Sequence, residues 1–247
     1  MKNYHNEKFV VDDTLLDFKE KVPFTEFVRM FQCATFKHSQ EMGLDHPSML
    51  EHSNAFWVVS KIKVSIKKQA RLSDKLTATT WTHPIGLVKA VRDCLIKVKS
   101  SVVAKCTSEW CCLDYETRKI RKLNSIQYPE LDMVKTQNLN TQFELFNVEI
   151  LEKDYAYTKT IRSSDLDVNM HTNNMKYNQM VYDAFSVDEL KTIDITDYEI
   201  QFVNESHLGD EIKIYKTKKA NKYYCLGKIG EKVIFRAIVK VKKNLTL

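Results

Sequence analysis

One segment of the sequence, residues 162–177, concentrates side chains that can carry out acid–base chemistry. Polar residues fall at alternate positions within it: Asp165, Asp167, Asn169 and His171. The positions between them are apolar: Leu166, Val168 and Met170. In an extended chain, alternate residues share one face. The spacing therefore predicts a row of two carboxylates, an amide and an imidazole, anchored by an apolar opposite edge.

A predicted helix begins immediately after this row. Asn173 and Asn174 are good N-cap residues for a helix whose apolar stripe continues to Phe185. A helix N-terminus presents free backbone N–H groups and a partial positive charge, which can stabilise the oxyanion of acyl transfer. A neighbouring histidine can accept a proton from water or relay it to a carboxylate. The segment therefore contains the groups needed to hydrolyse an activated ester without a covalent nucleophile.

A purely structural interpretation of the same residues stays open at this point. Asp and Asn crowd together at turns and helix caps because their side chains hydrogen-bond to nearby backbone groups. Residue types and spacing alone therefore do not separate a catalytic segment from a turn that is followed by a helix cap.

Hydrophobic periodicity predicts the elements that position this segment. Apolar residues at helical spacing predict a helix from Phe24 to about Gly43. His38 lies off the main stripe of this helix and is interpreted as a surface residue. Alternating apolar and polar residues then predict a group of strands: 61–67, 76–82, 87–98 and 102–113. A second helix, over 177–185, precedes a second group of strands: 197–203, 211–217, 223–229 and 233–241.

The repeated order of helix and strands suggests an internal duplication. An antiparallel sheet that wraps around its own helix is the α+β arrangement called a hotdog. The predicted fold class is therefore α+β, a tandem (double) hotdog with two antiparallel sheets that each wrap around a long helix. The predicted boundaries are 1–130 for the N-terminal hotdog domain, 131–149 for a linker rich in Gln, Asn and Thr, and 150–247 for the C-terminal hotdog domain.

Composition excludes several functional classes. None of the 5 glycines among the 247 residues has the spacing of G-x-S-x-G, of G-x-G-x-x-G or of a P-loop, motifs that need glycine for a sharp turn or for close approach to a phosphate. No apolar run approaches the about 20 residues of a membrane-spanning helix, and the first residues lack the apolar stretch of a secretory signal. We therefore expect a cytoplasmic location and no stable membrane insertion.

Cysteine spacing and charge narrow the choice of cofactors and partners. None of the 6 cysteines forms C-x-x-C, and H-E-x-x-H is absent, so we expect buried thiols, no metal and no cofactor. The net charge of +6 suits an acidic partner. The basic residues are scattered, so solvated strand faces explain them as well as a docking site does. No nucleic-acid partner is predicted, because aromatic residues do not interleave with a basic face.

The row of polar residues resembles the signature of acyl-acyl carrier protein thioesterases, a family of plant plastids with bacterial members. The matching run, R-x-S-D-L-D-x-N-x-H-x-N-N-x-K-Y, spans Arg162 to Tyr177. Shorter matches occur in the family's order: Arg92-Asp93, Ser108-x-Trp110, Asp114-x-x-Thr117-Arg118-Lys119 and Phe202-Val-Asn-Glu205-Ser206. The resemblance covers most of the chain, from the first helix to the last strand.

This resemblance implies a double hotdog whose first domain holds much of the acyl-chain pocket and whose second domain carries the chemistry. Carried over by motif position, the catalytic residues are Asp167, Asn169, His171 and Glu205. Glu205 and His171 would activate a water molecule as general base, Asn169 would position the water or the thioester, and Asp167 would orient the group. Helix N-terminal amides near Asn173 and Asn174 would polarise the thioester carbonyl.

Two positions depart from the family pattern. Some relatives have a cysteine directly after the glutamate, but this chain has Ser206, which would need a base of its own to act as a nucleophile. Direct attack by water is therefore favoured. Thr172 replaces a valine that is common in the family, a small change that we expect to be harmless.

The predicted function is hydrolysis of the thioester bond of fatty acyl-[acyl carrier protein], which releases free fatty acid and terminates chain elongation in fatty acid biosynthesis. Two alternatives stay open, an acyl-coenzyme A thioesterase and a non-catalytic acyl-binding hotdog module. The expected partner is the acidic acyl carrier protein with its acyl chain. Edge strands also leave homodimer formation open.

Overall fold

The computed structural model describes residues 3–130, 134, 138–139 and 142–244. The chain divides into two compact units, Met1–Thr141 and Gln142–Leu247, which are described separately. The predicted linker, 131–149, spans this division, and part of it lies outside the described residues. The domain limits at 130 and 150 stay a prediction.

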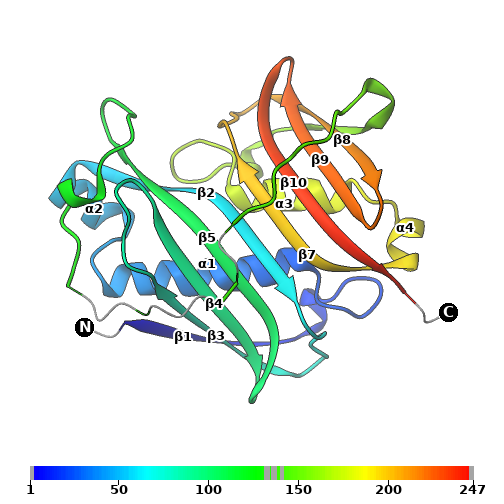
Figure 1. Cartoon of the computed structure of the whole chain (residues 1–247), viewed down its shortest axis with the longest axis horizontal. Coiled ribbons are helices and arrows are strands. Elements are labelled where there is room, and N and C mark those ends of the chain that lie inside the picture. The colour runs from blue at the N-terminus through cyan, green and yellow to red at the C-terminus, as the bar shows by residue number, and fades with distance from the viewer. Residues whose placement is uncertain (1–2, 131–133, 135–137, 140–141, 245–247) are drawn as a thin grey trace. The chain divides into compact units, whose positions relative to one another are not determined.

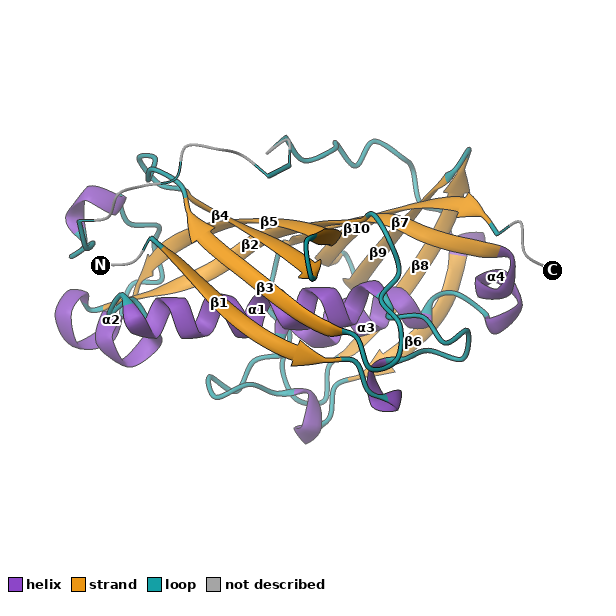
Figure 2. Cartoon of the chain, turned by 90° about the horizontal axis from the view of Figure 1, so that it is seen from below, coloured by secondary structure: helices purple, strands orange, loops and turns teal. Residues whose placement is uncertain are grey.

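Unit 1 contains one long helix and an antiparallel sheet (Figure 1). Its main elements are, in chain order, β1 (Tyr4–Val10), α1 (Phe24–Glu41), α2 (His46–Ser53), β2 (Ala55–Ile66), β3 (Lys75–Thr82), β4 (Ala90–Val98) and β5 (Ser101–Asp114). Hydrogen bonding places the strands in the order β1-β3-β4-β5-β2. Helix α1 lies along one face of these strands (Figure 2), where it contacts β1 and β3. Unit 1 is therefore a hotdog, as the sequence predicts.

Unit 2 repeats this arrangement element by element. Its main elements are β6 (Tyr155–Thr160), α3 (Asn174–Asp183), α4 (Val187–Thr192), β7 (Ile193–Phe202), β8 (Glu211–Lys219), β9 (Lys222–Ile229) and β10 (Lys232–Lys243). The strand order is β6-β8-β9-β10-β7, which matches the order in unit 1. The Tyr177 ring of α3 packs on the rings of Phe202 and Phe235 in the sheet, with centroids 5.9 and 5.7 Å away. The two units thus show the predicted α+β, double-hotdog class.

Each unit has a fifth strand that hydrophobic periodicity does not predict. The additional strands, β1 and β6, precede the long helix of their unit and lie at a sheet edge. Neither strand contains a buried residue. Since amphipathic alternation arises from burial of one face, an edge strand without a buried face leaves no such signal.

The buried face of α1 explains both its formation and one wrong prediction. Phe24, Phe27 and Phe31 are at most 1% exposed and fill the space between helix and sheet. His38 was predicted at the surface, but it is 0% exposed. It lies one turn beyond Ala34 on the same stripe, and its Nδ1 accepts a hydrogen bond from the buried Arg92 guanidinium at 2.8 Å. A polar partner in the core therefore allows the stripe to continue through a histidine.

The structure also shows the state of the cysteines, the grouping of possible metal ligands and the hydropathy of the helices. Four of the cysteines are buried, and all six are free thiols. Among the described residues, no group of three or more His, Cys, Asp or Glu side chains is placed to hold a metal ion. Across the same residues, every helix is too short or too polar to cross a membrane.

Candidate active site

The predicted row of polar residues forms a tight turn and not an extended strand. The Asp167 N–H donates to the His171 carbonyl at 2.8 Å, and the Met170 N–H donates to the Asp167 carbonyl at 3.1 Å. Met170 has a φ of 63°, in the left-handed region. Val168 and Met170, predicted to anchor the row, are 91% and 64% exposed. The predicted alternation is therefore wrong, because aspartate bonds to its own backbone and favours a turn over a strand.

Asp167 holds this turn through its carboxylate. Oδ1 accepts the N–H of Asn169 at 2.8 Å and the N–H of His171 at 3.2 Å. Asn169 lies exposed at the tip of the turn, where Asp167 accepts its N–H. The structure thus gives Asp167 an organising contact with the segment.

The turn is joined to the loop that follows β7. Leu166 and Thr172 form an isolated antiparallel bridge that closes the turn. The Thr172 N–H then donates to the Ser206 carbonyl at 2.9 Å. Because Thr172 follows His171 and Ser206 follows Glu205, this bond brings the two predicted catalytic residues to the same place.

His171 and Glu205 are in contact across these two loops. Nε2 of His171 lies 3.5 Å from Oε2 of Glu205, and their side chains are 21% and 52% exposed. The His207 ring lies edge-on to the His171 ring, with centroids 5.0 Å apart. Nζ of Lys232 donates to the Glu205 carbonyl at 3.0 Å. An imidazole and a carboxylate that meet while still reachable by solvent can take a proton from a water molecule.

Helix α3 begins three residues after His171. Asn173 is its N-cap, and Oδ1 of this residue accepts the N–H of Met175 at 2.9 Å. The Asn173 carbonyl accepts the N–H of Lys176 at 2.8 Å. Within the described part of the chain, the Asn174 N–H is the first-turn amide without an acceptor. Of the two predicted cap residues, Asn173 therefore caps the start of the helix, and Asn174 is the first helical residue.

A cluster of buried hydroxyl groups lies directly behind the pair. Oγ of Ser206 lies 2.7 Å from Oγ1 of Thr172 and 2.9 Å from the hydroxyl of Tyr177. Ser206 is 0% exposed, Tyr177 3% and Thr172 4%, and burial raises the pKa of the Tyr177 phenol. A fully buried serine hydroxyl that is engaged in this way cannot reach a substrate, which agrees with the expectation that Ser206 is not a nucleophile.

Asp165, which the sequence places in the same polar row, points into the protein. It is 3% exposed, and its carboxylate lies 2.9 Å from Nζ of Lys159 and 3.8 Å from Nζ of Lys176. Burial acts to raise the pKa of Asp165, but the Arg162 N–H and Lys159 outweigh it and hold this pKa below its usual value. Asp165 is therefore a structural ion-pair partner.

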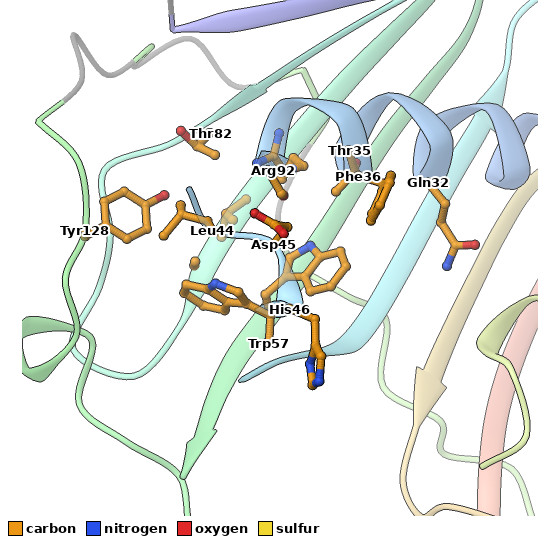
Figure 3. Close-up of a pocket in the computed structure, with 14 residues that line it drawn as sticks. Gln32, Thr35, Phe36, Leu44, Asp45, His46, Trp57, Thr82, Arg92 and Tyr128 are labelled. Atoms are coloured by element: carbon orange, nitrogen blue, oxygen red, sulfur yellow. The ribbon is translucent and has the colours of Figure 1, made fainter. Parts of the chain in front are cut away.

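A pocket of about 260 Å³ lies in unit 1 (Figure 3). Aromatic side chains form much of its wall: Phe36, Trp57, Trp110 and Tyr128. Arg92 also lines it; burial lowers the pKa of this guanidinium to about 10. Hydrophobic periodicity does not identify Trp57 and Trp110 as lining residues, because an aromatic residue in a strand gives no signal that separates packing from pocket lining.

Comparison with known proteins identifies similar chains of known activity. The sequence is 22% identical over 224 residues to "Oleoyl-acyl carrier protein thioesterase 1, chloroplastic" of Arabidopsis thaliana, covering 84% of this chain and 62% of that protein. It is 27% identical over 161 residues to "Palmitoyl-acyl carrier protein thioesterase, chloroplastic" of the same plant, covering 57% and 39%. The chain thus spans about three fifths of the length of the first of these curated relatives.

Solved structures confirm the fold. An acyl-ACP thioesterase from Bacteroides thetaiotaomicron superposes with a TM-score of 0.87 at 20% identity, covering 97% of this chain and 98% of that one. The 12:0-ACP thioesterase from Umbellularia californica superposes with a TM-score of 0.85 at 18% identity, covering 99% of each chain.

Family-level matches extend over both units. Residues 2–128 match the acyl-ACP thioesterase N-terminal domain, and residues 148–237 match the acyl-ACP thioesterase C-terminal domain. Together these ranges cover most of the chain, including both loops that carry His171 and Glu205. The chain therefore belongs to the acyl-ACP thioesterase family.

Proposed function

We propose that this protein hydrolyses the thioester bond of a fatty acyl chain carried on acyl carrier protein and releases the free fatty acid. The contact between Nε2 of His171 and Oε2 of Glu205, at 3.5 Å, carries the proposal. This contact joins two loops that are far apart in sequence and lies at the start of a helix. Backbone amides at a helix start can stabilise the oxyanion that forms during acyl transfer. Family membership and the names of the relatives support the same substrate class.

In the proposed reaction, the His171–Glu205 pair acts as general base. A water molecule transfers a proton to the pair while its oxygen bonds to the thioester carbon. Collapse of the tetrahedral intermediate breaks the carbon–sulfur bond, and the pair returns the proton to the departing thiolate. One water is consumed, and the products are a fatty acid and the free thiol of the carrier.

The surrounding backbone supplies orientation and charge stabilisation in this proposal. The Asn174 N–H would donate to the developing oxyanion, assisted by the partial positive charge at the start of α3. Asp167 would act through the turn, because its carboxylate fixes the backbone of His171. Asn169 stands at the exposed tip, where it would meet the arriving thioester or water.

We also propose that the unit 1 pocket receives the acyl chain, which is the role predicted for the N-terminal domain. Its wall is largely aromatic and aliphatic, and such walls favour hydrocarbon over water. A cytoplasmic location and homodimer formation stay predictions, which cell fractionation and sedimentation analysis would test.

Release of fatty acid from defined substrates tests the proposal. The protein is incubated with acyl chains of graded length on acyl carrier protein, and the released acids are identified by mass spectrometry. The same chains on coenzyme A are compared at low and high salt. We expect release from the carrier substrates, with a loss of kcat/KM at high salt that exceeds the loss for coenzyme A, because an extended contact between charged surfaces is screened more.

The opposing outcomes are distinct. Faster hydrolysis of the coenzyme A substrates at both salt concentrations would favour an acyl-coenzyme A thioesterase. Binding of acyl chains with no release from either carrier would contradict hydrolysis and favour an acyl-binding module.

A further inference from the structure

The two units contain the same five-residue turn before their long helix, at residues 17–21 and 167–171. In both turns the first N–H donates to the fifth carbonyl, at 2.9 Å in unit 1 and 2.8 Å in unit 2. The first residue is an aspartate in both, and its carboxylate accepts the N–H groups of the third and fifth residues. The fourth residue is left-handed, with φ of 56° for Glu20 and 63° for Met170. These turns are therefore structural equivalents.

The loops that complete the site are equivalent as well. They are residues 67–74, after β2, and residues 203–210, after β7. The fifth residue of each loop donates its N–H to the aspartate at the eighth position, at 2.8 Å in both. The seventh residue donates its N–H to the residue that follows the unit's first strand, at 2.7 Å in unit 1 and 3.0 Å in unit 2. The fourth residue is buried in both, Ala70 at 1% and Ser206 at 0%.

This correspondence shows which side chains differ between the two copies. Lys21 takes the place of His171, and Gln69 takes the place of Glu205. An ammonium group has no lone pair to accept a proton, and a carboxamide is far less basic than a carboxylate. Unit 1 therefore retains the backbone of the site without its acid–base pair.

The buried residues next to the acid–base pair also lose their polar groups in unit 1. In unit 2 they are Thr172, Tyr177 and Ser206, and the equivalent residues in unit 1 are Val22, Phe27 and Ala70. All six are buried. Each unit 2 residue differs from its counterpart mainly by a hydroxyl group. Because unit 1 forms the same turn and loop without these hydroxyls, the backbone of the site does not need them in order to fold.

The hydroxyl cluster connects the two catalytic residues through their neighbours in sequence. Thr172 directly follows His171, Ser206 directly follows Glu205, and their hydroxyl oxygens are 2.7 Å apart. Tyr177 completes the link, because its hydroxyl lies 2.9 Å from Oγ of Ser206 and accepts the N–H of the same residue at 3.2 Å. Hydrogen bonds of this kind are directional, so they restrict how the two loops move against each other.

We infer that Thr172, Tyr177 and Ser206 are positioning residues that hold Glu205 against His171 during catalysis. The inference rests on the proposed hydrolysis. Glu205 is half-exposed and meets His171 at 3.5 Å, so a small shift of its loop separates the two groups. A displacement of about 1 Å at a reacting group can cost about 100-fold in rate. The copy that has no acid–base pair also has no hydroxyl cluster, which is the pattern that a positioning role requires.

The test replaces the cluster with the residues that unit 1 already uses. The variant Thr172→Val/Tyr177→Phe/Ser206→Ala is compared with wild type on acyl-carrier substrate. We expect kcat to fall about 10- to 100-fold while KM changes little and thermal unfolding stays cooperative. Tyr157→Phe is the matched control, because it removes a tyrosine hydroxyl that donates to the Met180 carbonyl in the same unit. The control should keep the wild-type kcat.

A second comparison separates positioning from a general structural effect. The triple substitution is repeated in a Glu205→Gln background. If the hydroxyls act through Glu205, the triple substitution does not lower the kcat of the Glu205→Gln variant any further. If the triple substitution causes a general structural defect, it lowers the kcat of Glu205→Gln by the same factor as it lowers the kcat of wild type. Thr172→Ser, which keeps the hydroxyl, should retain most of the wild-type kcat. If the triple variant loses cooperative unfolding, Ser206→Ala alone replaces it, with an expected loss of about three- to tenfold.

Three results would overturn the inference. They are a wild-type kcat in the triple variant, an equal loss in the Glu205→Gln background, and an equal loss in Tyr157→Phe. Failure of the proposed function itself is recognised separately, because wild-type protein would then release no fatty acid before any variant is compared.

Discussion

Removal of the Asp167 carboxylate tests how the turn supports catalysis. In the Asp167→Ala variant, the N–H groups of Asn169 and His171 lose an acceptor that now lies 2.8 and 3.2 Å away. A hydrogen bond to a charged group contributes about 1.5–3 kcal/mol, and less where water can replace the acceptor. Since this turn is at the surface and the second bond is long, we estimate a total loss of about 2 kcal/mol.

That loss has consequences for both activity and stability. Every 1.4 kcal/mol corresponds to a factor of about ten in an equilibrium, so the fraction of molecules with an ordered turn falls and kcat decreases about 10- to 30-fold. For a chain of this length, about 2 kcal/mol lowers the melting temperature by about 4–8 °C. Steady-state kinetics on acyl-carrier substrate and thermal unfolding measure the two effects.

The chain provides its own control for this experiment. Asp17 accepts the N–H groups of Lys19 and Lys21 at 2.9 and 3.1 Å in the equivalent turn of unit 1. Asp17→Ala should lower the melting temperature by a similar amount while kcat stays near the wild-type value. A wild-type kcat in Asp167→Ala, or an equal loss of kcat in both variants, would refute the reasoning.

Three further predictions concern stability and reactivity. Lys159→Met should lower the midpoint of urea unfolding at pH 7, because the Arg162 N–H and Lys159 hold the pKa of Asp165 below its unfolded value of about 3.9. The stability that this lowered pKa contributes is present above about pH 3.9 and is lost as Asp165 becomes protonated, so the difference from wild type should shrink as the pH falls below that value. Met170→Gly should raise the melting temperature or leave it unchanged, because glycine adopts the φ of 63° without the cost of about 1 kcal/mol to a side chain. A thiol reagent at pH 8 should modify Cys33 and Cys111 before the four buried cysteines, because burial raises the pKa of each of those four thiols. Peptide mass spectrometry would show the order of modification.

Much of the fold follows from local pattern in the sequence. The spacing of Phe24, Phe27 and Phe31 predicts α1, and the apolar stripe that includes Tyr177 and Met180 predicts α3, because each helix buries one stripe on its sheet. Strands with one buried face were predicted for the same reason. Strands β1 and β6 were not, since they lie at sheet edges and bury no residue.

The sequence also predicted only part of the candidate site. Asp167, Asn169, His171 and Glu205 were identified from a motif, and the structure brings His171 and Glu205 together. The conformation of the motif was predicted incorrectly, because polar and apolar residues alternate in the same way in a strand and in a turn that leaves Val168 and Met170 exposed. The hydroxyl cluster involves contacts such as that from Tyr177 to Ser206, 29 residues along the chain. No periodicity in the sequence indicates a contact of that kind.

A double-mutant cycle on the acid–base pair tests the central claim most directly. The kcat for hydrolysis of acyl-carrier substrate is measured for His171→Gln, for Glu205→Gln and for the double variant. If the two residues act as one general base, each single substitution lowers kcat by about 10²–10⁴, and the double variant is no slower than the slower single variant. A wild-type rate in either single variant, or losses that multiply in the double variant, would contradict the account.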